Sequence, residues 1–209
     1  FSDEANFQLN GNVNSQNVRR YAPLKADDPV LGGRPKHFVV EMPCFSDKIM
    51  VFCGIKFDGS FGLKVYRNQN MNGNIYHSLL QYTVLPELRN GNGGDLENLW
   101  WQQDGAPCHV TDNNMRYLDG QFEGRVVSRR AIRGHDWPAR SPDLNPCDFY
   151  LWGYLKSVVY TPKPRNIAEL EAAIRREIAA LDPAICMKAI LDVKKRAVKC
   201  LAVNGGHFE

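Results

Sequence analysis

Residues 48–66, KIMVFCGIKFDGSFGLKVY, contain the pattern that decides the fold class. The first half, residues 48–57, is a strongly apolar run, which is typical of a buried strand. The Asp58-Gly59-Ser60 segment has the chemistry of a tight turn, and the FGLKVY that follows predicts a second strand. The stretch therefore predicts a β-hairpin within a sheet.

Outward from this hairpin, strand-like and helix-like segments alternate. Residues 1–9 predict a strand ahead of the hairpin, and apolar residues recur at helical spacing from Asn72 to Asn90, where a glycine-rich GNGG follows. The remaining expected elements are short strands at 99–103 and 125–128, and helices at 107–118, from 148 onward, at 166–180 and at 183–201. This order predicts an α/β domain, with a mixed sheet flanked by helices.

The chain of 209 residues suits a single domain spanning 1–209. A stretch rich in Pro, Gly and Asp at 22–47 predicts a long loop, of the kind that is often functional, and we treat 11–47 as a candidate insertion. The sequence starts with Phe1 rather than an initiator methionine or a signal peptide, so we expect a fragment of a longer protein.

Composition excludes several classes of protein. Hydrophobic residues make up 44% of the chain and charged residues 23%, which is ordinary globular composition and excludes disorder and fibres. No apolar run approaches the roughly 20 residues of a membrane helix. Six cysteines are widely spread without a CxxC pair, which argues against a zinc ribbon and favours free thiols in a reducing compartment.

Charge is distributed unevenly along the chain. The net charge is +3, and residues 1–100 carry 10 basic and 10 acidic side chains. Residues 125–165 carry eight basic and three acidic side chains, a local net charge of +5. Such a stretch hints at a polyanionic partner.

Three aspartates fall where expected strands end or helices begin: Asp3, Asp104 and Asp148. Carboxylates are the ligands that Mg²⁺ and Mn²⁺ prefer, and a few converging acids can hold two such ions for phosphoryl chemistry. Aspartates are also common at strand ends and helix caps for structural reasons, so spacing alone does not select these three.

Two longer motifs are more specific. QQDGAPCH at 102–109 and WPARSPDLNPCDFYLWGYLK at 137–156 resemble the mariner family of eukaryotic DNA transposases, whose catalytic domain is ribonuclease-H-like. The opening SDEANFQLNGNVNSQNVRRYA, the strand KIMVFCGIKFDG and the closing KCLAVNGG are also similar to that family. The resemblance covers essentially the whole chain.

The resemblance implies catalytic roles by position. The first two catalytic acids fall on Asp3 and Asp104, and the third falls on Asp148, just after SPDLNP, with Asp143 as a competing candidate. The 43 residues between Asp104 and Asp148 exceed the spacing in the best-known mariner elements, which suggests extra residues between Gln121 and Arg140. The implied cofactors are two Mg²⁺ or Mn²⁺ ions.

Neighbouring residues have a functional and a structural interpretation each. His109 either contacts the scissile phosphate or orients a ligand, or else caps its own helix, and Glu4 should point to the opposite face of its strand from Asp3. The candidate DNA-binding residues beside the acids are His109, Arg129, Arg130, Arg133, Arg140 and Lys156.

Other residues near the motifs are expected to be structural. Cys108 and Cys147 are interpreted as core thiols. One of Trp100 and Trp101 is expected in the core, while Trp137 and Trp152 are assigned to packing rather than to stacking on a flipped base. The residues expected on a solvated face of the last helix are Lys194, Lys195 and Arg196.

The resemblance implies a nuclear enzyme that cleaves double-stranded DNA at transposon ends and joins the 3′-hydroxyl to target DNA at TA sites. It further implies a homodimer and N-terminal helix-turn-helix modules outside this fragment, so weak and nonspecific DNA binding is expected here. Two alternatives remain open: a domesticated DNA- or protein-binding module without catalysis, and a ribonuclease-H-like nuclease that cuts without joining.

Overall fold

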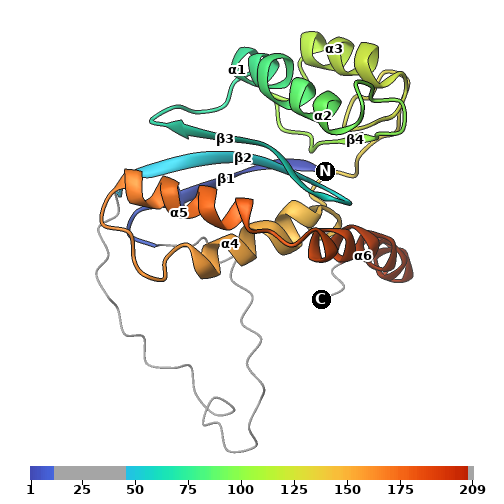
Figure 1. Cartoon of the computed structure of the whole chain (residues 1–209). Coiled ribbons are helices and arrows are strands. Elements are labelled where there is room, and N and C mark those ends of the chain that lie inside the picture. Colours follow the sequence, from blue (N-terminus) through green and yellow to red (C-terminus); the bar gives the residue numbers. More distant parts are fainter. Residues whose placement is uncertain (12–45, 207–209) are drawn as a thin grey trace, which may run out of the picture.

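A computed structural model describes residues 1–11 and 46–206 of the chain. The central element is an antiparallel sheet in the order β1-β2-β3, formed by Ser2–Gln8, Lys48–Lys56 and Gly59–Arg67. The register pairs Asp3 with Cys53 and Ile49 with Arg67. The expected hairpin is therefore confirmed, and β1 joins its β2 edge (Figure 1). The loop predicted at 22–47 lies outside the described residues, except for 46 and 47.

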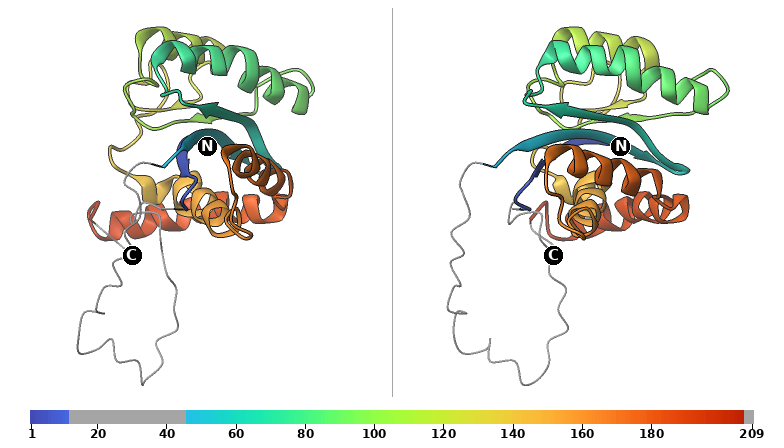
Figure 2. Two further views of the ribbon diagram at one scale, coloured as in Figure 1. Left: turned by 90° about the vertical axis from the view of Figure 1, so that its left-hand side faces the viewer. Right: turned by 60° about the vertical axis from the view of Figure 1, so that its left-hand side comes forward.

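Helices cover both faces of this sheet (Figures 1 and 2). One layer contains α1 (Gly73–Leu79), a π-helical segment η3 (Leu80–Val84), α2 (Leu85–Gly91) and α3 (Asp112–Phe122). The other contains a second π-helical segment η5 (Cys147–Leu151), α4 (Trp152–Val158), α5 (Ile167–Ala179) and α6 (Pro183–Ala202), with a 3₁₀ turn η4 (Pro142–Leu144) just before it. The predicted α/β class with flanking helices is confirmed.

The alternation of side chains along β2 explains the two helical layers. Ile49, Val51 and Cys53 belong to the core beneath α4, α5 and α6, whereas Phe52 belongs to the core beneath α1, α2 and α3. Successive side chains of a strand point to opposite faces, so a strand apolar at nearly every position must be buried on both. The sequence of β2 therefore requires a three-layered arrangement.

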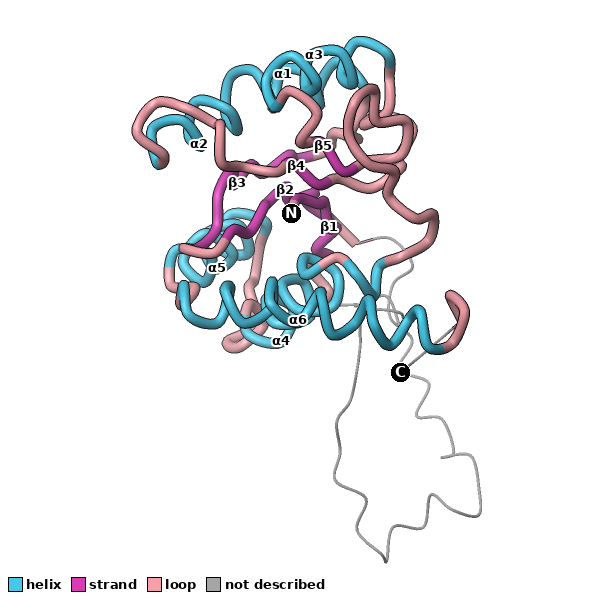
Figure 3. Tube along the Cα trace, turned by 90° about the vertical axis from the view of Figure 1, so that its right-hand side faces the viewer, coloured by secondary structure: helices cyan, strands magenta, loops and turns pink. Residues whose placement is uncertain are grey.

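Two short strands form a separate parallel pair beside the main sheet. β4 (Trp101–Gln102) pairs with β5 (Val126–Val127), and Trp101 lies opposite Val126. Figure 3 shows the pair next to β2 and β3, under α3. The Ser2 hydroxyl donates to the Gln102 carbonyl at 3.0 Å, which ties β1 to β4. The antiparallel sheet and the parallel pair together give the mixed strand directions expected from the sequence.

The helix predicted at 107–118 was placed too early. Thr111 is extended and its side chain accepts a hydrogen bond from the amide of Asn114, which makes Thr111 the N-cap of α3. Pro107 instead lies in a turn, where the amides of His109 and Val110 donate to the Ala106 carbonyl. A proline is compatible with either position, so this signal did not fix the boundary.

The predicted helix from Asn72 to Asn90 is present but interrupted. Asn72 caps it through hydrogen bonds from the amides of Asn74 and Ile75. The π-helical η3 separates α1 from α2, and Pro86 follows it. Proline has no N–H for the helical ladder, which accounts for an irregularity at this position.

None of the described helices is long and apolar enough to cross a bilayer.

Candidate active site

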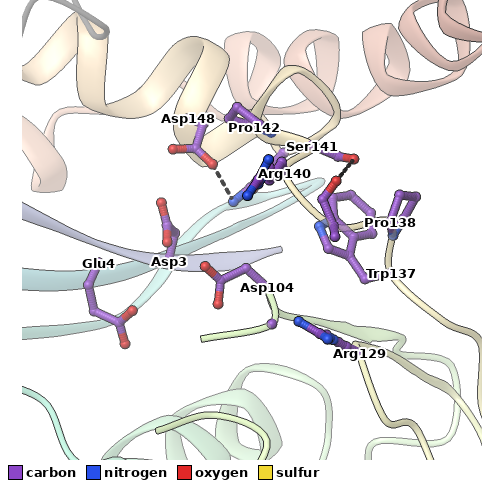
Figure 4. A pocket seen from close by; sticks show the side chains of 13 residues that line it. Asp3, Glu4, Asp104, Arg129, Trp137, Pro138, Arg140, Ser141, Pro142 and Asp148 are labelled. Carbon is purple, nitrogen blue, oxygen red and sulfur yellow. Dashed lines mark hydrogen bonds between the residues drawn. The ribbon is translucent and has the colours of Figure 1, made fainter. Parts of the chain in front are cut away.

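Three acids from three distant elements line one cavity of about 480 Å³ (Figure 4). Asp3 is the second residue of β1, Asp104 follows the end of β4, and Asp148 lies in the first turn of η5. The cavity opens where the main sheet, the parallel pair and the α4 layer meet. The fold thus brings together the three aspartates that the motifs predicted.

Each acid has one oxygen held by a hydrogen-bond donor. The Trp152 indole donates to Asp3 Oδ2 at 2.8 Å, and the Asn145 amide donates to Asp148 Oδ2 at 3.1 Å. Asp104 Oδ1 accepts from the backbone amide of Ala106 at 2.9 Å and lies 2.7 Å from His109 Nδ1. These contacts orient the carboxylates around the cavity.

The electrostatics of the acids differ from one to the next. Burial, reinforced by the charges of Asp148 and Glu4, raises the pKa of Asp3 well above its ordinary value. Burial also raises the pKa of Asp148 to about 6, although hydrogen bonds from Asp3 and Asn145 oppose it. For Asp104, burial acts in the same direction, but hydrogen bonding to His109, the His109 charge and the Ala106 amide together lower its pKa.

This pattern fits a site for hard divalent cations. Like charges gathered in a partly buried place oppose ionisation, and a cation removes that opposition. Carboxylate oxygens are the donors that Mg²⁺ and Mn²⁺ prefer. Within residues 1–11 and 46–206, no three acidic, histidine or cysteine side chains already surround a single metal position. The carboxylates share the cavity without being arranged as ligands.

His109 and Glu4 form a second group behind Asp104. The His109 side chain is 3% exposed, and its Nε2 lies 3.1 Å from both carboxylate oxygens of Glu4. Burial lowers the pKa of His109, but Tyr76 and the hydrogen bonds to Asp104, Cys108 and Glu4 outweigh it and raise the pKa well above 6.5. The histidine therefore does not cap a helix; it bridges two carboxylates.

The expected orientation of Glu4 is confirmed, with an addition. Its carboxylate points away from that of Asp3 (Figure 4). It nevertheless lines the same cavity and reaches Asp104 through His109. Strand alternation gives the direction of a side chain but not its partner from another element, so the sequence did not indicate this link.

The basic residues divide into two groups. Arg129 and Arg140 line the cavity with the acids (Figure 4). Arg130 instead bonds Asp112 and the Val110 carbonyl, and Arg133 bonds Asp119. Lys156 is partly buried above the Phe7 ring, 5.7 Å from its centroid, and burial lowers its pKa. Two of the expected DNA-binding side chains therefore lie at the cavity itself.

The structure also separates Asp148 from its competitor. Asp143 lies on η4, where its backbone carbonyl accepts from Arg196 Nε and its carboxylate is 3.8 Å from Arg196 Nη2. Asp143 does not line the cavity, whereas Asp148 does. Arg196 also lies 4.3 Å from the Phe149 ring centroid. The interpretation of Arg196 as a solvated side chain was therefore wrong, because α6 packs this position against η4 and η5.

The tryptophans and cysteines mostly take structural positions. Trp101 is buried and Trp100 is exposed against His135, as the strand alternation predicted. Trp152 is buried and bonds Asp3, while Trp137 lines the cavity. The described cysteines, including Cys108 and Cys147, are free thiols. Asn145 and Trp152 were not identified as site residues, although each lies three or four positions from Asp148, one helical turn away.

Solved structures share this fold. The paired-end complex of the Mos1 mariner transposase with Mn matches all of this chain and 56% of that chain, with a TM-score of 0.73 and 19% identity. The Mos1 transposase catalytic domain with Raltegravir and Mg matches 78% of each chain, with a TM-score of 0.67 and 20% identity. The chain therefore has a ribonuclease-H-like α/β fold, in which three acids converge on one cavity.

The chain is similar in sequence to transposases of nematodes. The Tc3 transposase of Caenorhabditis elegans is 30% identical over 164 residues, which are 77% of this chain and 41% of that protein. The Tcb1 transposase of Caenorhabditis briggsae is 28% identical over 211 residues, 93% of this chain and 67% of that protein. No family model matches the chain. The chain is similar in sequence to these transposases over most of its length, and its fold is that of the catalytic domain of the Mos1 mariner transposase. It spans less than half the length of the Tc3 relative.

Proposed function

We propose that this domain catalyses metal-dependent hydrolysis of DNA phosphodiesters at transposon ends, followed by transfer of the freed 3′-hydroxyl to target DNA. The observation that carries the proposal is the cavity in which Asp3, Asp104 and Asp148 face Arg129 and Arg140. Acids alone repel a phosphodiester, and arginines alone cannot activate a nucleophile. Their combination around one cavity suits a phosphate with its cations.

In this proposal the three aspartates hold two Mg²⁺ or Mn²⁺ ions. The ions would supply activation of the attacking oxygen and stabilisation of the leaving oxygen. Trp152, Asn145 and the Ala106 amide fix the directions of the three carboxylates. Arg129 and Arg140 neutralise phosphates beside the cut, which positions the strand without reading its sequence.

The same site serves both steps. In hydrolysis, the water oxygen bonds to phosphorus and the P–O3′ bond breaks, which leaves a 3′-hydroxyl and a 5′-phosphate. In strand transfer, that 3′-hydroxyl attacks a target phosphodiester and a target 3′-oxygen leaves. Both steps place a trigonal-bipyramidal phosphorus between two oxygens, so one set of ligands serves both.

The longer protein is proposed to act on paired ends as a homodimer, in the nucleus and with TA target sites. The support is that Mos1 transposase, which shares this fold, forms paired-end and strand transfer complexes. Recognition of the end sequence is assigned to helix-turn-helix modules outside this chain. We therefore expect this domain alone to bind duplex DNA weakly.

The first test is Mn²⁺ binding by calorimetry, on the wild type and on Asp104→Ala, Asp148→Ala and Asp143→Ala. We expect the first two substitutions to abolish binding, because they remove ligands, while Asp143→Ala retains it, because Asp143 faces Arg196. Nicking of supercoiled plasmid in Mn²⁺ should follow the same order. Metal binding that ignores Asp104 and Asp148 would support the noncatalytic binding module instead.

A strand transfer assay separates the remaining alternative. A precleaved duplex with a free 3′-hydroxyl is incubated with target plasmid and Mn²⁺, and joined products are measured. Nicking without joining in the longer protein would favour a plain nuclease over a transposase.

A further inference from the structure

Glu4, His109 and Asp104 form a chain of contacts between two separate strand ladders. Glu4 belongs to β1 of the antiparallel sheet, and Asp104 follows β4 of the parallel pair. Backbone pairing within each ladder does not set the distance between the two. That distance is set by side chains that contact residues of both ladders, and His109 is one of them.

His109 is held on every side. Its Nδ1 lies 2.7 Å from Asp104 Oδ1, and its Nε2 lies 3.1 Å from the Glu4 carboxylate. Its ring packs against Tyr76, with centroids 4.3 Å apart, and the Tyr76 hydroxyl is itself bonded to Gln103 at 2.6 Å. The backbone amide of His109 donates to Ala106 at 2.9 Å. A ring so enclosed has no freedom to swing toward a DNA phosphate.

We propose that His109 is a positioning residue that clasps Asp104 to Glu4, and so fixes the second metal-binding acid relative to the strand that carries the first. The inference rests on the proposed function. Asp104 Oδ1 accepts a hydrogen bond from the Ala106 amide and is also in hydrogen-bond contact with His109 Nδ1. These two contacts fix the carboxylate and leave Oδ2 for the cavity. Glu4 acts through His109 and does not bind the metal.

The other two acids lack such a clasp. Asp148 is oriented by Asn145, three residues earlier on the same segment, and Asp3 by Trp152 of α4. Both donors lie in or next to the α4 layer. Asp104 is the acid on the opposite side of the cavity, so its placement needs a link across the ladders. Partners that orient a metal ligand typically change metal affinity by about 10- to 100-fold when they are removed.

The test is a double-mutant cycle read out as Mn²⁺ affinity by calorimetry. The variants are His109→Gln, Glu4→Gln and the two combined, with His135→Gln as the control because His135 is exposed against Trp100. We expect His109→Gln to weaken Mn²⁺ binding about tenfold, and Glu4→Gln to weaken it less. The double variant should bind no more weakly than His109→Gln, because Glu4 acts through the histidine.

Three results would overturn the clasp. His109→Gln with wild-type Mn²⁺ affinity would show that the histidine is only structural, whatever its effect on folding. Fully additive losses would show that Glu4 contacts the metal on its own. Equal weakening by His135→Gln would show a general effect of histidine removal.

A metal-free measurement keeps the inference separate from the proposed function. The wild type, the two single variants of the cycle and the double variant are unfolded in urea with chelator. We expect the double variant to lower the urea midpoint by less than the sum of the decreases caused by the two single variants. If the wild type binds no Mn²⁺, the proposed function fails, and the clasp is then judged by this cycle alone: additive midpoints would overturn it.

Discussion

At the scale of single residues, two of the three acids of the cavity, Asp3 and Asp148, lie in surroundings that oppose their ionisation. Burial raises the pKa of both Asp3 and Asp148; the charge of Asp148 adds to the rise at Asp3, and the charge of Asp104 adds to the rise at Asp148. Asp104 is the exception because His109 and the Ala106 amide stabilise its charge. Without a cation, the ionised site therefore reduces the stability of the fold.

This arrangement makes stability depend on pH in a defined direction. The folded pKa of Asp148 is about 6, above its ordinary 3.8, so between these values the folded state binds more protons than the unfolded state. Stability then falls as pH rises from about 4 to about 6. We expect metal-free Asp148→Asn to be more stable than the wild type by roughly 2 kcal/mol at pH 7, and equal to it near pH 3.5. Urea unfolding with chelator measures both proteins across this range.

Asp143→Asn is the matched control. Because Asp143 faces Arg196, this substitution should not increase the free energy of unfolding at pH 7. Excess Mn²⁺ should reverse the order of wild type and Asp148→Asn, because only the wild type is stabilised by binding. A lower stability of Asp148→Asn at pH 7 without metal would contradict this account.

At the scale of elements, the segment after β5 is held in place by backbone contacts. The amide of His135 donates to the Val126 carbonyl at 2.9 Å, and the amide of Ser128 donates to the His135 carbonyl at 3.0 Å. A Cβ at Gly134 would lie 1.9 Å from the Val126 carbonyl oxygen, so only glycine fits. This attachment precedes Trp137 and Arg140, which form part of the cavity wall.

We expect Gly134→Ala to destabilise the fold by on the order of 3 kcal/mol, because the backbone must shift to accept the methyl group. It should also weaken Mn²⁺-dependent nicking by displacing the wall. Gly120→Ala is the control: Gly120 is exposed within α3 and has open space at its Cβ, so we expect a gain of about 0.5–1 kcal/mol from helix propensity. Denaturant unfolding decides, and a neutral Gly134→Ala would refute the close approach.

At the scale of the whole molecule, the basic stretch at 125–165 is divided by the fold. Arg129 and Arg140 are directed to the cavity, whereas Arg130 and Arg133 form ion pairs with Asp112 and Asp119 of α3. The sequence gives the local charge, but the fold decides which of these charges meet a substrate.

We therefore expect different salt dependences of DNA binding for different arginines. Arg140→Ala should reduce the slope of log K against log salt by about 1, because one phosphate contact is lost. Arg133→Ala should leave the slope unchanged, since its partner is Asp119. Fluorescence anisotropy on a labelled duplex, over a series of salt concentrations, gives both slopes. Equal slopes for the two variants would contradict the division of charges.

The sequence by itself determined the local elements and the candidate acids. Turn chemistry at 58–60, the apolar run of β2 and the helical spacing after Asn72 depend only on neighbours in the chain, so they predict a hairpin and a helix directly. The motifs around Asp104 and Asp148 likewise predicted the acids, and carried the resemblance to mariner transposases, through residues close in sequence.

Only the tertiary structure decided the partners of those residues. Glu4 and Asp104 are linked by His109, Asp3 is bonded by Trp152 and Asp143 faces Arg196, all across long separations in the chain. Such contacts depend on how the sheet and the two helical layers pack, and no local pattern records that packing. The sequence therefore predicts which carboxylates are candidates, and the packing determines which of them share a cavity and what holds each one in place.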